Sequence, residues 1–325
     1  MSSTPTYGFQ GRLAAEFPSQ IIVDATEICN LECIHCPHPD FKRSAHFGSR
    51  SLPRELHDKM VEEVRTHGRG HTQYIRYTSN GEPLIHSGIY DMLDHAVQNS
   101  GVFITLTTNG TILNAPRVEG LLRSGLHLID VSIDAVKAET YSLIRRKGRL
   151  DVTQSNVQRL IAMRNETRAR TRIVVSFVEQ PQNSEEAADF ERFWTEQGAD
   201  RVVIRRLHSA AGGVKGIADR LKHQHAAEAR RPCLYPWERI LLNPAGQLAF
   251  CPQDWVHGSV LADYRETTIR ETWTSDGYRR LREAHLANNF SCHGFCGQCP
   301  DWASTRWPGQ GLSYADMVGS FQAEP

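Results

Sequence analysis

Short apolar runs alternate with amphipathic runs over the first two thirds of the chain. The apolar, β-rich runs predict six strands at residues 21–24, 74–77, 103–107, 128–133, 173–178 and 202–204. Runs with helical spacing lie between them, at residues 53–64, 89–97, 118–122, 138–145, 152–164 and 185–197. Strands that alternate with helices predict parallel pairing through right-handed crossovers. Six such units predict an α/β fold, a partial (β/α)6 barrel of TIM type rather than a closed barrel of eight units.

The pattern changes after residue 208. Residues 209–232 are rich in glycine, alanine, histidine and basic side chains and predict a linker. Beyond it, apolar runs at 240–242 and 247–251 flank Asn243-Pro244-Ala245-Gly246 and predict a hairpin, and a helix is expected at 276–287. We therefore expect an N-terminal extension at 1–19, the barrel at 20–208, the linker at 209–232 and a small α+β domain at 233–325.

Polar segments follow the second, third and fourth predicted strands. They are Ser79-Asn80-Gly81-Glu82-Pro83, Thr108-Asn109-Gly110 and Asp134. Chemistry in parallel α/β folds collects at the carboxyl ends of the strands. We therefore expect the functional site at that end of the barrel.

Charge and composition narrow the class of protein. Lys plus Arg and Asp plus Glu both number 37, so no overall field attracts nucleic acid or an acidic membrane. The first twenty residues lack the apolar run and cleavage site of a signal peptide, and no stretch approaches the roughly 20 apolar residues of a membrane span. We expect a cytoplasmic protein with no nucleic-acid or membrane partner, whose eight cysteines are reduced and favour metal binding.

Three of these cysteines, Cys29, Cys33 and Cys36, stand in one short loop after the first predicted strand. Thiolates are soft ligands suited to iron–sulfur clusters, and three of them leave one iron of a cubane open. Zinc is the alternative, with His35 or His38 as the fourth ligand. The position of the loop after the first strand of a βα run favours the cluster.

The C-x3-C-x2-C spacing at this position resembles that of radical S-adenosylmethionine (SAM) enzymes. The resemblance continues over residues 20–208. It implies that Cys29, Cys33 and Cys36 hold a [4Fe–4S] cluster, that SAM chelates the open iron, and that one electron releases a 5′-deoxyadenosyl radical. A flavodoxin- or ferredoxin-type protein is the implied electron donor.

The same resemblance implies a set of SAM contacts. Asn80-Gly81-Glu82-Pro83 resembles the GGEP segment of the family, with asparagine in place of the first glycine. The implied SAM-binding residues are His35, Asn80, Gly81, Glu82, Thr107, Thr108, Asn109, Ser132, Asp134 and Arg145. For His35 the contact is by its backbone. The alternative for each segment, taken alone, is that its polar residues cap the end of a strand and do not contact SAM.

Five cysteines remain in the last hundred residues: Cys233, Cys251, Cys292, Cys296 and Cys299. Four thiolates fill a cubane, so one is spare. The C-x12-G-x4-C hairpin resembles the SPASM and shorter twitch extensions of radical SAM enzymes, and it implies a second, auxiliary [4Fe–4S] cluster on Cys233, Cys251, Cys296 and Cys299. Zinc is again the alternative. Cys292 is then a hydrogen-atom donor, a swapped ligand or a small buried residue.

Candidate substrate contacts follow the predicted strands at Tyr77, Glu179, Arg205, Arg206 and His208. An arginine guanidinium matches a carboxylate or phosphate bidentately. These side chains are otherwise solvated rim charges or SAM contacts. The resemblance implies a polar small molecule, such as a sugar, aminocyclitol or nucleoside of antibiotic biosynthesis, that is dehydrogenated, epimerised, dehydrated or decarboxylated. A peptide or protein substrate is the alternative, and a non-catalytic metal scaffold is the alternative of another class.

Overall fold

The barrel strands form the larger part of one nine-stranded sheet. The computed structural model describes residues 16–305 and 313–324. The sheet order is β6-β5-β4-β3-β2-β1-β7-β8-β9. The first six strands pair in parallel and are β1 Gln20–Val23, β2 Tyr74–Tyr77, β3 Phe103–Thr108, β4 Leu128–Ser132, β5 Arg172–Glu179 and β6 Arg201–Arg206. The six strands and the open, partial barrel are confirmed, because β6 stands at the edge of the sheet.

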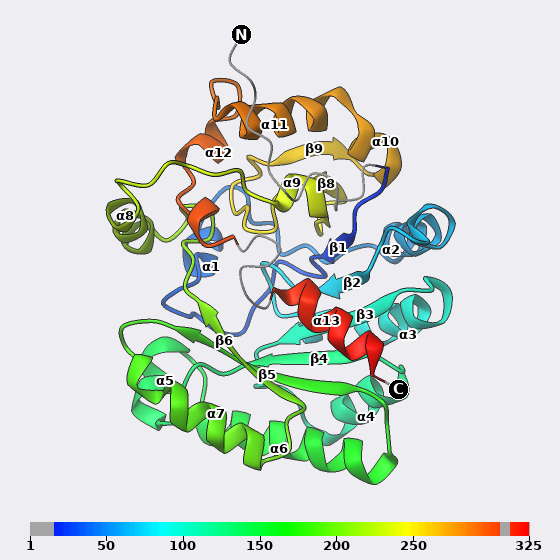
Figure 1. Ribbon diagram of the computed structural model, residues 1–325. Coiled ribbons are helices and arrows are strands. Elements are labelled where there is room, and N and C mark those ends of the chain that lie inside the picture. Colours follow the sequence, from blue (N-terminus) through cyan, green and yellow to red (C-terminus); the bar gives the residue numbers. More distant parts are fainter. Residues whose placement is uncertain (1–15, 306–312, 325) are drawn as a thin grey trace.

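Helices cover the outer face of these strands (Figure 1). They are α2 Arg54–Glu63, α3 Ile89–Asn99, α4 Ala115–Arg123, α5 Ala138–Ile144, α6 Leu150–Thr167 and α7 Ala187–Glu196. Leu150, Val157 and Ile161 of α6 fall on one face at helical spacing and are buried in the main core. Alternate strand residues, such as Ile75 and Ile129, meet the helices in that core. This packing leaves the opposite face of each strand for the barrel interior.

The remaining strands extend the sheet beyond β1. Strand β7 (Arg239–Leu242) pairs in parallel with β1, and β8 (Gln247–Ala249) and β9 (Val260–Asp263) add antiparallel strands. The predicted hairpin is present, and Gly246 in its turn has φ of +79°. The helices of this part are α9 Tyr235–Glu238, α10 Ile269–Thr274, α11 Asp276–Ala287 and α12 Gly294–Gln298. The cysteine-rich part therefore shares a sheet with the barrel.

Several helices have no counterpart in the predicted pattern, and three of them bear on the barrel and the linker. Helix α1 (His38–Phe41) follows the first cysteine loop, and α8 (Lys215–Gln224) lies inside the expected linker, where Ala218 and Leu221 are buried. Helix α13 (Tyr314–Ala323) lies across the inner face of the barrel sheet (Figure 1). Its Met317, Val318 and Phe321 pack on inward residues of the strands, among them Tyr74 and Leu128. The barrel interior is thus filled from the C-terminal segment.

Residues 1–15 of the expected N-terminal extension lie outside the described ranges. Within those ranges, no helix combines the length and the apolar character needed to cross a membrane.

Candidate functional site

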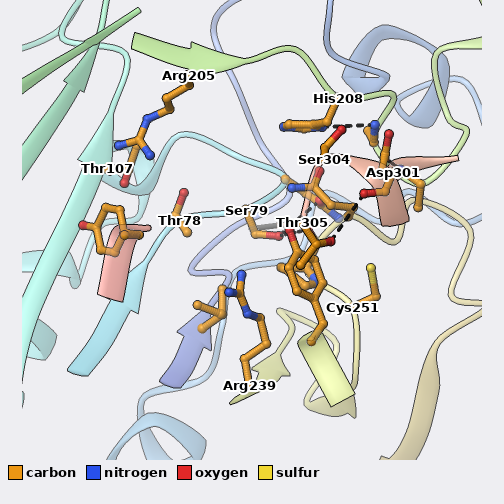
Figure 2. A pocket seen from close by; sticks show the side chains of 18 of the residues that line it. Thr78, Ser79, Thr107, Arg205, His208, Arg239, Cys251, Asp301, Ser304 and Thr305 are labelled. Carbon is orange, nitrogen blue, oxygen red and sulfur yellow. Dashed lines mark hydrogen bonds between the residues drawn. The ribbon is translucent and has the colours of Figure 1, made fainter. Parts of the chain in front are cut away.

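A cavity of about 490 Å³ lies between the carboxyl ends of the barrel strands and the cysteine-rich part. Segments far apart in the sequence meet there (Figure 2). Seven of the eight cysteines line it: Cys29, Cys33, Cys36, Cys233, Cys251, Cys296 and Cys299. The cavity therefore brings both cysteine groups to one space.

The first cysteine loop is held by the end of α5. The Ile34 N–H donates to the Ile144 carbonyl at 3.0 Å, and the Glu32 N–H donates to the Arg146 carbonyl at 3.1 Å. Burial raises the pKa of the three thiols, that of Cys29 to about 12. Metal coordination deprotonates such a thiol. A partly buried loop that presents three thiols to a cavity fits the open cluster expected there.

The two histidines of this segment do not complete a zinc site. The Nε2 atom of His38 lies 2.9 Å from the Glu27 carbonyl oxygen, and that of His35 faces Asp134 at 3.7 Å. Among the described residues, the only three His, Cys, Asp or Glu side chains whose ligand atoms lie within 4.8 Å of one another are His57, Asp58 and His95. Sulfurs around a tetrahedral zinc lie about 3.8 Å apart. No three of the described cysteines place their sulfurs within 4.8 Å of one another, as ligands of one tetrahedral zinc ion would.

The segment after β2 makes a close backbone contact at Gly81. A Cβ atom there would lie 1.9 Å from the Thr26 carbonyl oxygen, so only glycine fits. Next to it, the Glu82 carboxylate is buried and accepts hydrogen bonds from the Thr108 hydroxyl at 2.7 Å and the Asn109 N–H at 2.8 Å. The Asn80 side chain donates to the Asp254 carbonyl. Glu82 thus ties the segments after β2 and β3 together at the cavity wall.

Arg145 at the end of α5 lies at the cavity, whereas Asp134 in the loop after β4 does not. Asp134 is fully buried, and its carboxylate pairs with the Arg145 guanidinium at 2.7 Å and accepts the Val178 N–H at 2.7 Å. Arg145 lines the cavity and Asp134 lies behind it. Of the other expected SAM contacts, His35, Asn80, Gly81, Glu82, Thr107, Thr108, Asn109 and Ser132 all line the cavity. Asp134 is therefore better described as the group that orients Arg145.

The second cysteine group assembles from separate segments. Cys233 precedes α9, Cys251 follows β8, and Cys296 and Cys299 frame the end of α12. Burial raises the pKa of the Cys251 thiol, and the negative charges of the other three cysteines raise it further. The Arg230 guanidinium donates to the Cys296 carbonyl at 2.6 Å and so fixes this segment. The four thiols therefore lie near enough to affect one another electrostatically, and all four line the cavity.

Cys292 stands apart from the other seven cysteines. It is exposed, and it does not line the cavity. Neither the ligand role nor the role of hydrogen-atom donor gains support from this position.

The expected substrate contacts divide into two groups. Arg205, Arg206 and His208 line the cavity, and Figure 2 shows Arg205 and His208 beside it. Two expectations are corrected. The Tyr77 side chain is fully buried in the outer core and its hydroxyl lies 2.6 Å from the His57 Nε2 atom, and Glu179 is exposed outside the cavity.

Sequence reasoning missed several residues of the cavity: Arg76, Arg239, Asp301 and Tyr314. Successive strand residues point to opposite faces, so the inward position of β2 belongs to Arg76 once Tyr77 is in the core. Arg76 donates to the Thr107 hydroxyl at 2.9 Å. Alternation places Arg76 opposite Tyr77 but does not say which of the two faces inward, and Tyr314 comes from a helix that the pattern did not predict.

Comparison with known families agrees with this geometry. The radical SAM superfamily matches residues 23–190, more than half of the chain. The chain belongs to the radical SAM superfamily. The SPASM family, an iron–sulfur cluster-binding domain, matches residues 233–300. The expected cofactors of a radical SAM enzyme with an auxiliary cluster domain, namely SAM and iron–sulfur clusters, are confirmed.

Individual relatives act on different molecules. A GTP 3′,8-cyclase from Desulforamulus reducens is 28% identical over 54% of this chain, which spans only 51% of the cyclase. The structure of BtrN in complex with AdoMet and 2-DOIA has a TM-score of 0.61, with 15% identity over 90% of this chain and 96% of BtrN. Streptococcus suis SuiB bound to precursor peptide SuiA also has a TM-score of 0.61, with 16% identity over 95% of this chain and 74% of SuiB. These two structures support the fold and leave the substrate open.

Proposed function

We propose that this radical SAM enzyme abstracts a hydrogen atom from a polar small molecule of the sugar, aminocyclitol or nucleoside type, in natural-product or antibiotic biosynthesis. The observation that carries the proposal is the cavity of about 490 Å³ between the two cysteine groups. Its size matches sites that bury a small molecule. The Arg205, Arg206 and His208 side chains in its wall suit hydroxyl and acidic groups. BtrN in complex with 2-DOIA, which shares the fold over nearly its whole length, supports this class.

The cofactor ligands are assigned as follows. Cys29, Cys33 and Cys36 hold the SAM-binding [4Fe–4S] cluster, and Cys233, Cys251, Cys296 and Cys299 hold one auxiliary [4Fe–4S] cluster. The first cluster, when bound with SAM, supplies the 5′-deoxyadenosyl radical. The chain itself positions SAM through the segments at Gly81, Asn109 and Arg145. The reductant is a flavodoxin- or ferredoxin-type protein of the cytoplasm.

The outcome of the reaction depends on where the substrate radical sends its electron or finds a hydrogen atom. An auxiliary cluster in the wall of the same cavity can accept an electron, which favours dehydrogenation. Cys292 faces solvent, so an epimerisation would need another donor. Dehydration or decarboxylation would need an acid or base close to the substrate, a place that His208 holds in the wall.

A peptide or protein substrate is the second candidate, favoured by the shared fold with SuiB bound to precursor peptide SuiA. That likeness covers 74% of SuiB. Peptides therefore belong in the substrate screen beside sugars and nucleosides.

The deciding experiment is anaerobic reconstitution followed by reduction with dithionite, addition of SAM, and assay of 5′-deoxyadenosine with iron and sulfide counts. We expect SAM cleavage and about eight irons, because each cubane carries four. About four irons with cleavage would remove the auxiliary cluster from the proposal. Bound zinc without cleavage would contradict the radical function and support a scaffold. Stimulation of 5′-deoxyadenosine by sugars or nucleosides, and not by peptides, is the result expected of the substrate screen.

A further inference from the structure

A layer of charged side chains lies on the inner face of the barrel, next to the cavity. Its members are Arg76 on β2, Asp130 on β4 and Arg205 on β6. Each stands two positions along its strand from a residue that packs on α13: Tyr74, Leu128 and Val203. Side chains two apart on a strand share a face. The layer therefore separates the apolar packing on α13 from the open cavity above it.

Both arginines use the same carboxylate oxygen. The Arg205 Nη2 atom lies 2.6 Å from the Asp130 Oδ2 atom, and the Arg76 Nη2 atom lies 3.3 Å from it. The other oxygen of Asp130 accepts a hydrogen bond from the Ser176 hydroxyl at 2.7 Å. Asp130 is fully buried, and so it holds both guanidinium groups at fixed positions.

The layer has a net positive charge, because its two arginines share the single negative charge of Asp130. Within residues 16–305 and 313–324, Asp130 is the one acidic side chain in ion-pair distance of either arginine. The side chains of Arg76 and Arg205 are only 17% and 26% exposed, so water compensates them poorly. Arg76 is also covered by the Tyr314 ring, 3.6 Å from its guanidinium carbon. A poorly hydrated, uncompensated cation at a cavity wall favours an anionic ligand.

Donor groups on this pair remain available for such a ligand. Arg76 donates to Thr107 and Asp130 through Nε and Nη2, and Arg205 donates to Asp130 through Nη2. Within the described residues, the Nη1 atom of Arg76 and the Nε and Nη1 atoms of Arg205 have no protein acceptor. Both side chains line the cavity. The open donors of two guanidinium groups suit the oxygens of a carboxylate or a phosphate.

We propose that Arg76 and Arg205 bind an anionic group of the substrate, a carboxylate or a phosphate ester, with Asp130 as the positioning residue of the pair. This inference rests on the proposed function and narrows its substrate class from polar to acidic small molecules. The carboxylate of SAM has the same chemistry, so the experiment must separate the two ligands.

The test is calorimetric binding to the reconstituted, cluster-loaded protein with saturating SAM, using matched probes: D-glucuronate against D-glucose, and uridine 5′-monophosphate against uridine. We expect the anionic member of a pair to bind about tenfold more tightly or better, as charge-assisted hydrogen bonds permit. In Arg205→Gln this preference should fall to near parity, because Asp130 then neutralises Arg76. Arg205→Lys should retain part of the preference, since lysine keeps the positive charge but lacks the planar, forked set of donors of a guanidinium group.

Arg192→Gln is the matched control, because Arg192 is an exposed arginine of α7 paired with Asp189. It should keep the full preference for the anion. Equal affinity of the wild-type protein for charged and neutral probes, or no binding of either anion, would overturn the inference. So would an Arg205→Gln protein that loses SAM affinity by as large a factor as probe affinity. Binding does not require SAM cleavage, so a protein that prefers anions but makes no 5′-deoxyadenosine contradicts the proposed function alone.

Discussion

The two cysteine-bearing regions reach the same cavity by different routes. In the barrel, Cys29, Cys33 and Cys36 stand in one loop that follows a single strand. In the C-terminal region, the four cysteines that line the cavity come from segments that precede α9, follow β8 and border α12. The first set of ligands is thus local in sequence, whereas the second exists only after the sheet extension and helices have packed. A local set can be read from spacing, and a dispersed set depends on the tertiary fold.

The largest expected effect is at the local loop. Cys36→Ala leaves two of its three thiols and should abolish 5′-deoxyadenosine formation in the anaerobic assay. Iron content should fall from about eight to about four, because the auxiliary cluster is untouched. Normal SAM cleavage by this variant would show that the loop does not hold the active cluster.

A change in the dispersed set should separate iron content from SAM cleavage. Cys299→Ala should lower iron by about four atoms per chain and reduce substrate turnover, while some SAM cleavage remains. Cys292→Ala is the matched control, because Cys292 is exposed and lies outside the cavity wall. It should keep the full iron count. Equal iron loss in both variants would place Cys292 among the ligands.

Gly81 offers a smaller, graded test of the barrel site. In Gly81→Ala, the new methyl group would overlap the Thr26 carbonyl oxygen, so the segment after β2 must shift. We expect a loss of about 1–3 kcal/mol in the free energy of unfolding and weaker SAM binding. Gly216→Ala in α8 has open space around the new atom and should instead gain up to about 1 kcal/mol. Denaturant titration measures both, and unchanged SAM affinity in Gly81→Ala would contradict the assigned role.

The contact between the two regions should show the smallest effect. The buried Glu63 carboxylate of α2 accepts hydrogen bonds from the Tyr264 hydroxyl at 2.7 Å and the Ile269 N–H at 2.8 Å. Glu63→Gln keeps the shape and one acceptor, so unfolding free energy should fall by about 1 kcal/mol. The neighbouring Glu62 is exposed, and its partners among the described residues, Arg65 and Thr66, both lie in the turn after α2. Glu62→Gln should change stability by less than about 0.5 kcal/mol, and an equal loss in both would show that Glu63 does not join the regions.

The sequence predicted the barrel well because each strand and helix has its own periodic pattern. The cysteine loop and the segment at Gly81 were also predictable, since their residues are contiguous. Which face of β2 points into the barrel was not predictable, because its four residues, Tyr74-Ile-Arg-Tyr77, place large side chains on both faces. A short strand of this composition does not fix which side faces the core.

Helix α13 shows a second limit. Its residues carry no strong amphipathic pattern, because Tyr314 and Met317 face the sheet beside small residues such as Ala315. Only the open barrel, with an inner face to cover, explains its position. The charged layer of Arg76, Asp130 and Arg205 could not be predicted from the sequence either, because its members come from three strands that meet only in the folded sheet.

The pairing of β7 with β1 fixes the distance between the two cysteine groups of the site. Ile21 lies opposite Ile240, and Val23 lies opposite Leu242. Strand β1 leads into the loop of Cys29, and β7 leads through the hairpin to Cys251. The spacing of the two cysteine groups is therefore set in steps of about 3.3 Å per residue of register, rather than by the length of the linking chain. Lengthening the segment at 209–232 would leave that spacing unchanged, whereas a slip of one residue between β1 and β7 would alter it.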